Sequence, residues 1–282
     1  MSSTRLAHPY ERRSPMATTN FYAPPSAIKG SRVVFPEDEG HHLRSVLRAQ
    51  EEDEVVVVDG EGGWHRVRID HLASNQVVGT IQESRQNVGE PDVHVTVGMG
   101  LLTKRSRFET FVEKAVEVGV ARIVPLRTRH AETGTLRRER IRNVMIAALK
   151  QCRRSRLPAL AEPQPVERAL STTEVDLRVL CHGGDDRRSF FDVVGETEPG
   201  ARVLLMVGPE GGFSSEEVEQ AEAAGSIVAS LGSRRLRAET AGLVALSAVT
   251  LSGEGPSGTG ESTCEKPAEG EHAEGVSVDD DD

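Results

Sequence analysis

The sequence predicts an α/β fold that follows a small β-barrel-like domain. From Val93 onward, short apolar runs alternate with segments whose apolar residues recur at helical spacing, as in a parallel sheet with crossover helices. Between Asn20 and about Val88, several short strand-like runs accompany one helical segment, which is typical of a small barrel. Two of the later runs end in glycine-rich loops, and open α/β sheets bind small molecules outside the carboxyl ends of their strands.

The chain of 282 residues divides into four parts on this pattern. Residues 1–19 are expected to form a disordered arm, 20–88 the barrel domain and 92–253 the α/β domain. Residues 254–282 are rich in Gly, Ser and Glu and cannot bury enough apolar surface to become ordered. We therefore expect them to form a disordered acidic tail.

The barrel domain contains one expected helix, over residues 37–47, with Leu43, Val46 and Leu47 on one face. Residues 59–63 (DGEGG) have the composition of a hairpin turn. Strands are expected over residues 32–35, 55–58, 64–69 and 76–81.

The α/β domain is expected to contain strands over 93–102, 122–126, 175–181, 203–207 and 227–231, and helices over 108–118, 136–153 and 239–251. A further helix begins at Ser214, because Glu217 three residues later completes a capping box. Gly119 is the expected stop of the first helix. The last helix is apolar nearly all round, so it must be buried, and a subunit interface is a natural place for it.

The net charge of −10 conceals a strong local asymmetry. The tail holds ten acidic residues and one lysine, so it carries −9 and the rest of the chain only −1. Residues 122–156 hold eleven Lys and Arg against two Glu, a local charge of +9. Such a segment either binds a polyanion through its local field or is a solvated arginine-rich helix face. Charge alone leaves both possibilities open.

Other totals exclude several classes of protein. The three cysteines are widely spaced, without a metal pattern or an even disulfide framework, and are compatible with a reducing cytoplasm. The first 20 residues lack the apolar core of a signal peptide. No apolar run approaches the roughly 20 residues of a membrane span. Aromatic residues are scarce, which argues against base stacking as the main binding device.

Two loops contain the candidate ligand-binding residues. Gly208-Pro209-Glu210-Gly211-Gly212 is neither a P-loop nor a dinucleotide fingerprint. Its glycines let the backbone approach a ligand closely, or they merely form a tight turn. The second loop follows Leu231 and contains Arg234 and Arg237, with Glu239 and Thr240 just beyond. A structural turn has no need of two arginines and a glutamate, so the pair of loops favours a ligand-binding crevice. The alternative for Glu239 is a first-turn carboxylate that the helix dipole favours, and the alternative for Thr240 is a helix cap.

The motifs together resemble a known family. They are His41-His42-Leu43-Arg44, Val46-Leu47-Arg48, Lys114 and Glu117 in EKAVEVGV, Gln151, Arg154 and Arg156 in KQCRRSRLP, GPEGG, and LGSRRLRAET. In order and spacing the chain is similar, over about residues 20–251, to the bacterial 16S rRNA (uracil-N3)-methyltransferase family of the SPOUT superfamily. It departs from that pattern at several positions, among them Lys150, where a glutamate is usual, and Arg235, where an aliphatic residue is usual.

The resemblance implies a PUA-like barrel, which binds RNA, before a SPOUT methyltransferase domain with a C-terminal trefoil knot. It also implies a cytoplasmic homodimer, no metal, and S-adenosylmethionine held by the knot loops. The implied cofactor-binding residues are Leu180, Gly208, Pro209, Glu210, Gly211, Gly212, Leu231, Gly232, Leu236 and Thr240. The implied RNA-binding residues are His42, Arg44, Arg48, Lys104, Arg107, Lys114, Gln151, Arg153, Arg156 and Arg234.

The implied reaction is methylation of uracil N3 in small-subunit rRNA. Loss of the N3 proton leaves an imide anion, which Arg237 or Arg154 is expected to stabilise. Glu239 is expected to act either as the general base or by orienting that arginine. Glu210 either offsets the sulfonium charge or caps its own loop. Two alternatives stay open, namely a SPOUT enzyme with another RNA target and a non-catalytic RNA-binding assembly factor.

Overall fold

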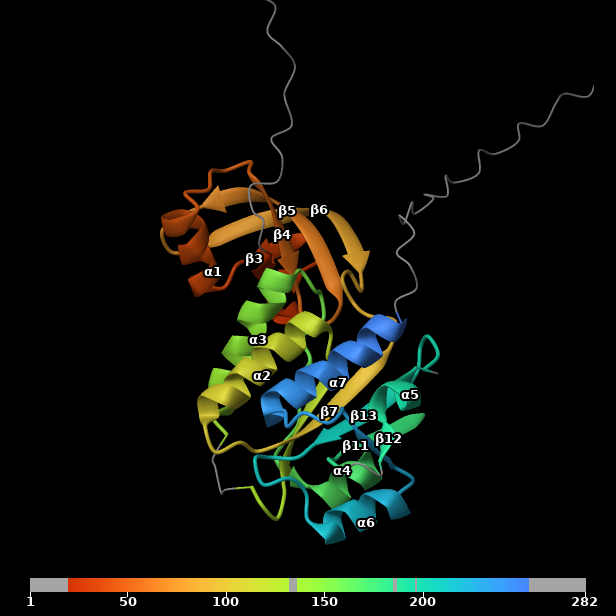
Figure 1. Ribbon diagram of the computed structural model, residues 1–282. Helices are drawn as coiled ribbons and strands as arrows, with labels where there is room; N and C mark the ends of the chain where they lie inside the picture. The colour runs from red at the N-terminus through yellow and green to blue at the C-terminus, as the bar shows by residue number, and fades with distance from the viewer. Residues whose placement is uncertain (1–19, 132–135, 185–186, 196, 254–282) are drawn as a thin grey trace, which may run out of the picture.

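The computed structural model describes residues 20–131, 136–184, 187–195 and 197–253. These form an N-terminal β-domain beside a larger α/β domain (Figure 1). The predicted arm and tail, residues 1–19 and 254–282, lie outside the described residues. None of the described helices is both long and apolar enough to span a membrane.

The N-terminal domain is a six-stranded sheet in the order β1-β4-β5-β6-β3-β2. Its core is apolar and includes Phe21, Leu43 and Ile69. In the predicted hairpin turn, Asp59 Oδ1 accepts bonds of 2.7 and 2.8 Å from the amides of Glu61 and Gly63. The strands are β1 (Phe21–Tyr22), β2 (Ile28–Lys29), β3 (Arg32–Val34), β4 (Glu54–Val58), β5 (Gly63–Leu72) and β6 (Val77–Gln86). Pro25–Ala27 form a short 3₁₀ turn.

The predicted helix over 37–47 exists, but its apolar face differs from the prediction. An α-helical turn, α1 (Glu37–His41), continues as a π-helical turn, η2 (His42–Val46). The amide of Leu47 donates to the carbonyl of His42, five residues back. This wider turn changes the angular spacing of the side chains. Leu43 is therefore fully buried, whereas Val46 is 65% exposed, so the placement of Val46 on the buried face was wrong.

The second domain is an eight-stranded sheet in the order β10-β8-β7-β13-β11-β14-β12, with β9 also paired to β8. Every pairing in it is parallel, as the alternating pattern predicted. Its strands are β7 (His94–Gly100), β8 (Arg122–Arg127), β9 (Ala159–Leu160), β10 (Gln164–Pro165), β11 (Leu177–Cys181), β12 (Arg188–Ser189), β13 (Arg202–Val207) and β14 (Ile227–Ser230).

Helices cover both faces of this sheet (Figure 1). On one face lie α2 (Arg105–Val118), α3 (Arg138–Cys152), α5 (Phe190–Val194) and α7 (Ala238–Gly253), and on the other α4 (Val166–Thr172) and α6 (Ser215–Ala223). The predicted stop at Gly119 is confirmed by its φ of 108°. The capping box of Ser214 and Glu217 is also confirmed.

The last helix, α7, is buried on only one side within this chain. Ala245, Leu246 and Val249 are buried, and the helix packs on β7, β13 and α2. Gly242 is the point of closest approach, because a Cβ there would lie 2.5 Å from Met99 Cε. On the remaining face Leu251 is 64% exposed. The helix is therefore buried on one side, and the expectation of all-round burial does not hold within a single chain.

The two domains are joined by specific polar contacts. Lys150 Nζ on α3 lies 2.5 Å from Glu39 Oε1 on α1, and this carboxylate is only 3% exposed. Arg142 of the same helix donates to the Tyr22 hydroxyl at 3.2 Å. Burial raises the pKa of Glu39, and Lys150 opposes that rise. Helix α3 is thus the element against which the β-domain is positioned.

Candidate functional site

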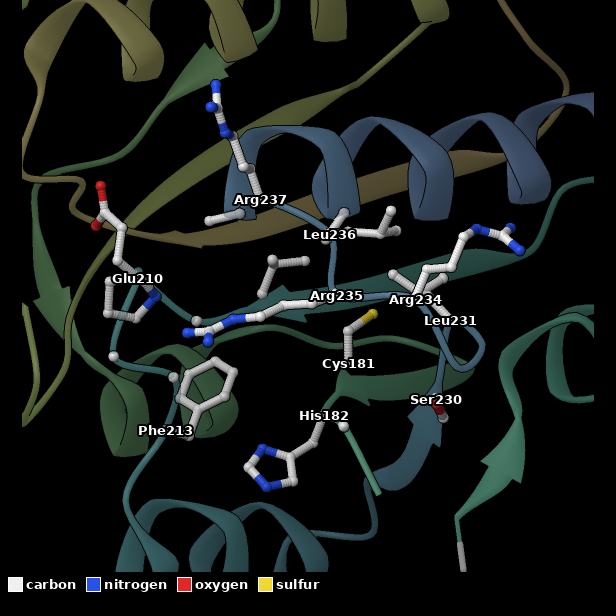
Figure 2. Close-up of a pocket in the computed structure, with 18 of the residues that line it drawn as sticks. Cys181, His182, Glu210, Phe213, Ser230, Leu231, Arg234, Arg235, Leu236 and Arg237 are labelled. Atoms are coloured by element: carbon white, nitrogen blue, oxygen red, sulfur yellow. The ribbon is translucent and has the colours of Figure 1, made fainter. Parts of the chain in front are cut away.

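A crevice opens where three neighbouring strands end. β13, β11 and β14 are adjacent in the sheet, and because they are parallel, the loops that follow them meet at one edge. The space between these loops is about 530 Å³, within the range of roughly 300–1,000 Å³ for small-molecule sites. Figure 2 shows the side chains that surround it.

The loop after β13 depends on its glycines for close packing. A Cβ on Gly208 would lie 3.0 Å from the backbone of Gly212, and one on Gly211 would lie 2.7 Å from His130 Cβ. Gly212 has a φ of 72°, and its amide donates to the carbonyl of Pro209 at 2.9 Å. On the side where a Cβ of Gly212 would point there is open space. The loop therefore presents bare backbone to the crevice.

The loop after β14 is rich in cations. It turns at Gly232, whose φ is 108°, and Leu236 lines the crevice. Arg234, Arg235 and Arg237 are exposed, and none has an ion pair or side-chain hydrogen bond within the described residues. In Figure 2, Arg235 reaches across the crevice toward the loop of Glu210 and Phe213, whereas Arg234 points in the opposite direction.

The third loop, which follows β11, was missed from the sequence. Cys181, His182 and Gly183 line the crevice, and the His182 amide donates to the Ala229 carbonyl at 3.0 Å. Burial raises the pKa of the Cys181 thiol to about 12. The thiol is therefore protonated at neutral pH, and the thiol form is a poor nucleophile. The signal that could have found this loop is the Gly183-Gly184 pair, which follows the predicted strand 175–181 as glycines follow the other two strands.

Arg107, at the start of α2, connects the two charged loops. Its Nη1 lies 3.5 Å from Glu210 Oε1 and its Nε lies 3.6 Å from Glu239 Oε1. The amide of Thr103 also approaches Glu210 Oε2, at 3.4 Å. Glu239 Oε2 is buried and has no hydrogen-bond donor within the described residues. Arg107 lines the crevice, so the arginine that contacts Glu239 is neither Arg237 nor Arg154.

The crevice brings together eight of the ten residues implied to bind the cofactor. Leu180 and Thr240 are not among its lining residues. Leu180 is fully buried in the core on the opposite face of the sheet, because successive strand residues point to opposite faces. Thr240 is exposed in the first turn of α7. The eight that line it are Gly208, Pro209, Glu210, Gly211, Gly212, Leu231, Gly232 and Leu236.

Arg154 lies outside the crevice, contrary to expectation. Its side chain is 4% exposed, with Nη2 2.7 Å from Glu90 Oε2 and Nη1 donating to the Val116 carbonyl at 2.7 Å. Glu90 also accepts from the amides of Ser155 and Arg156. A buried guanidinium that is fully paired in this way fixes the segment after α3 against α2. Arg154 thus has a structural role and does not reach the crevice of its own chain.

The residues implied to bind RNA are distributed over several elements. Arg44 donates to the Ala73 carbonyl at 3.1 Å. Lys114 Nζ lies 2.8 Å from both Glu113 and Glu117, contacts that raise the pKa of this lysine. Arg156 is exposed and bonds to Asn87 Oδ1 at 2.8 Å. The His42 ring packs edge-on against Phe21. Arg48, Lys104, Gln151 and Arg153 are exposed on the surface.

A parallel sheet with a small-molecule crevice at its strand ends defines an open α/β ligand-binding protein, here with an N-terminal β-domain. A family model described as an RNA methyltransferase domain matches residues 89–250, more than half of the chain, and one described as an RNA methyltransferase PUA domain matches residues 35–82. The chain belongs to this RNA methyltransferase family, as its motifs predicted.

Named relatives agree with this assignment. Ribosomal RNA small subunit methyltransferase E of Synechocystis is 32% identical over 233 residues, which cover 80% of this chain and 75% of that protein. The protein of the same name from Bacillus subtilis is 25% identical, over 81% and 90% of the two chains. The Neisseria gonorrhoeae enzyme of that name, solved bound to S-adenosyl methionine, is 26% identical with a TM-score of 0.74, over 83% and 98%.

Proposed function

We propose that this protein transfers a methyl group from S-adenosylmethionine to N3 of a uridine in 16S rRNA. The observation that carries the proposal is the crevice at the ends of β11, β13 and β14, which is lined by the two loops that the sequence singled out. Relatives named small subunit rRNA methyltransferases support the substrate, and the neighbour solved with S-adenosyl methionine supports the cofactor.

The residues of the crevice fit this cofactor. Gly212 and Gly232 leave open space where other residues would carry a side chain, so a ligand can approach the backbone closely. Leu231 and Leu236 supply apolar surface, and Glu210 supplies a carboxylate on the opposite side. When bound, the cofactor supplies a methyl group activated by its sulfonium. Glu210, which also faces Arg107, is the group proposed to offset that positive charge.

The residues around the acceptor base are proposed from charge and burial. Methylation at N3 requires that the N3 proton leave, here to solvent water, and the resulting negative charge spreads to the flanking carbonyl oxygens. Arg237 lines the crevice and has no ion pair within the described residues, so its cation is available to stabilise that charge. Glu239 has one oxygen against Arg107 and the other buried, which supports an orienting role over that of general base.

The remaining features extend the proposal. The exposed cations Arg48, Lys104, Arg153, Arg156 and Arg234, with His42, Arg44, Lys114 and Gln151, would contact the RNA, and phosphate contacts position a substrate without reading its sequence. A trefoil knot is supported by the path of residues 231–237, since α7 packs on β13 and β7, on the far side of β11 from β14. The exposed Leu251 side of α7 supports a homodimer, and the rRNA substrate implies a cytoplasmic enzyme.

The direct test uses 16S rRNA from a strain that lacks this protein. Incubation with the purified protein and S-adenosylmethionine should add one methyl group, and mass spectrometry of nuclease fragments should place it on N3 of a single uridine. A methyl group on a ribose hydroxyl or on another base would refute the N3 assignment. If no methyl group is transferred and calorimetry detects no cofactor binding, the enzymatic interpretation fails.

A further inference from the structure

Arg235 is a cation inside the crevice without a counter-charge. It belongs to the lining of the cavity, and Figure 2 shows its side chain extended across the opening toward the loop of Glu210 and Phe213. Within the described residues, no carboxylate lies within ion-pair distance of its guanidinium and no acceptor bonds to it. By contrast, Arg107 on the other wall faces two carboxylates.

The crevice is therefore electrically polarised. On one side, Glu210 is the one carboxylate among the lining residues that the structure describes, and its neighbour Arg107 is shared with Glu239, which is not part of the lining. The other wall holds Arg234, Arg235 and Arg237 and is strongly positive. A ligand that fits between such walls places its cationic groups near the first and its anionic group near the second.

S-adenosylmethionine has that distribution of charge, with a sulfonium, an ammonium and a single carboxylate. We infer that Arg235 binds the carboxylate of the cofactor's methionine portion, an inference that rests on the proposed function. A ligand that fills the cavity displaces water from the guanidinium, and a desolvated cation without a partner is costly. The guanidinium is suited to this contact because it can donate two parallel hydrogen bonds to a carboxylate.

Arg234 provides a matched control. It is the neighbouring residue, carries the same charge, is likewise exposed, and points in the opposite direction. Both substitutions, Arg235→Leu and Arg234→Leu, remove one exposed arginine from the same loop, so neither is expected to affect folding. If a general positive field attracts the ligand, the two variants will behave alike, whereas a specific contact distinguishes them.

The experiment is a binding cycle measured by calorimetry on the full chain. S-adenosylmethionine and its decarboxylated analogue are titrated into the unmodified protein, Arg235→Leu and Arg234→Leu. We expect Arg235→Leu to weaken binding of the carboxylated ligand by about 10- to 100-fold, and binding of the analogue by less than about 2-fold. Arg234→Leu removes an equal charge from the same wall without removing the contact, so it should weaken either ligand by less than about 2-fold. Arg235→Lys should recover part of the loss, because it restores the charge without the planar pair of donors.

Each other outcome has a definite meaning. Equal losses for both ligands, or for both arginine variants, would refute the carboxylate contact. If Arg235→Leu leaves cofactor binding intact but weakens RNA binding in a filter assay, Arg235 faces a phosphate and the inference is wrong. If the unmodified protein binds neither ligand, the proposed function itself fails. This result differs from one in which the unmodified protein binds both ligands and Arg235→Leu weakens them equally, which refutes only the carboxylate contact.

Discussion

The guanidinium of Arg107 lies 3.6 Å from the carboxylate of Glu239, although the two residues are more than 130 positions apart. A second contact of 3.5 Å joins Arg107 to Glu210. Because Glu210 lies in the loop after β13 and Glu239 in the first turn of α7, one side chain on α2 contacts both of these segments. Groups that act as such a unit have non-additive effects when they are removed.

Removal of this arginine should therefore impair the enzyme at least as much as removal of Glu239, because it also breaks the contact with Glu210. We expect Arg107→Met and Glu239→Gln each to lower kcat at least 10-fold, and the double variant to be no worse than Arg107→Met alone. Single-turnover methylation of 16S rRNA gives these rates. If the loss of kcat in the double variant equals the product of the two single losses, Arg107 and Glu239 act independently and the prediction is wrong. If Glu239 acts as the general base instead, the rate of methylation will depend on pH. Glu239→Gln would then abolish that dependence, whereas Arg107→Met would retain it.

The cation proposed for the imide anion can be tested separately. Arg237→Ala should lower kcat by about 10²- to 10³-fold, the range observed when one group that stabilises a developing oxyanion is removed. The cofactor dissociation constant should change little. A loss seen only in KM would show that Arg237 binds substrate without stabilising the reacting charge.

The position of the GPEGG loop depends on a glycine outside it. A Cβ on Gly100 of β7 would lie 2.4 Å from Pro209 N, whereas one on Gly98 of the same strand would meet only the side chains of Leu126 and Met206, at 3.1 and 3.3 Å. We expect Gly100→Ala to displace the loop and weaken S-adenosylmethionine binding about 10-fold or more. Gly98→Ala serves as the control, with binding within about 2-fold. Similar binding by both variants would refute this role.

The ion pair between the domains should make stability depend on pH. Lys150→Met leaves Glu39 buried without a partner, at a cost of about 3 kcal/mol near pH 8. Burial already raises the pKa of Glu39, so its folded form retains a proton that the unfolded chain loses, and stability falls as pH rises above the ordinary value of 4.5. Without Lys150 this fall extends to higher pH.

Urea titrations at pH 5 and pH 8 measure the effect. The loss caused by Lys150→Met should be smaller at pH 5, where Glu39 is protonated more readily. Arg187→Met breaks the more exposed pair with Glu222 and should cost less than about 1 kcal/mol at either pH. If Lys150→Met lowers the free energy of unfolding equally at both pH values, the loss does not arise from the charge of Glu39.

The basic surface predicts a salt-dependent affinity for RNA. Arg156 is exposed, and its Nε bonds to a neutral amide oxygen, so its charge is available to a phosphate. Arg156→Ala should lower the slope of log K against log salt by about 1. Arg202→Ala is the control, because Arg202 is paired with Asp176 at the opposite ends of the strands. An unchanged slope would exclude Arg156 from the RNA surface.

Local patterns predicted most of the elements correctly, because each depends on short-range physics. The capping box at Ser214 and the stop at Gly119 are set by residues within one turn. The short strands β9, β10 and β12 and the helices α4 and α5 were not predicted. Their runs of two to seven residues have too little periodicity. Val46 was misplaced because a π-helical turn leaves no mark in the pattern.

The sequence alone determined that two glycine-rich loops follow parallel strands, and this was enough to locate the crevice. Only the tertiary structure decided which charges face each other there. It buried Arg154 against Glu90, 64 residues away, and it brought Arg107 to Glu239 instead. It also extended Arg235 across the cavity toward the loop of Glu210, with Arg234 pointing in the opposite direction. The physical reason is that a loop's position follows from the strand before it, whereas the partner of a long charged side chain depends on elements that only packing brings together.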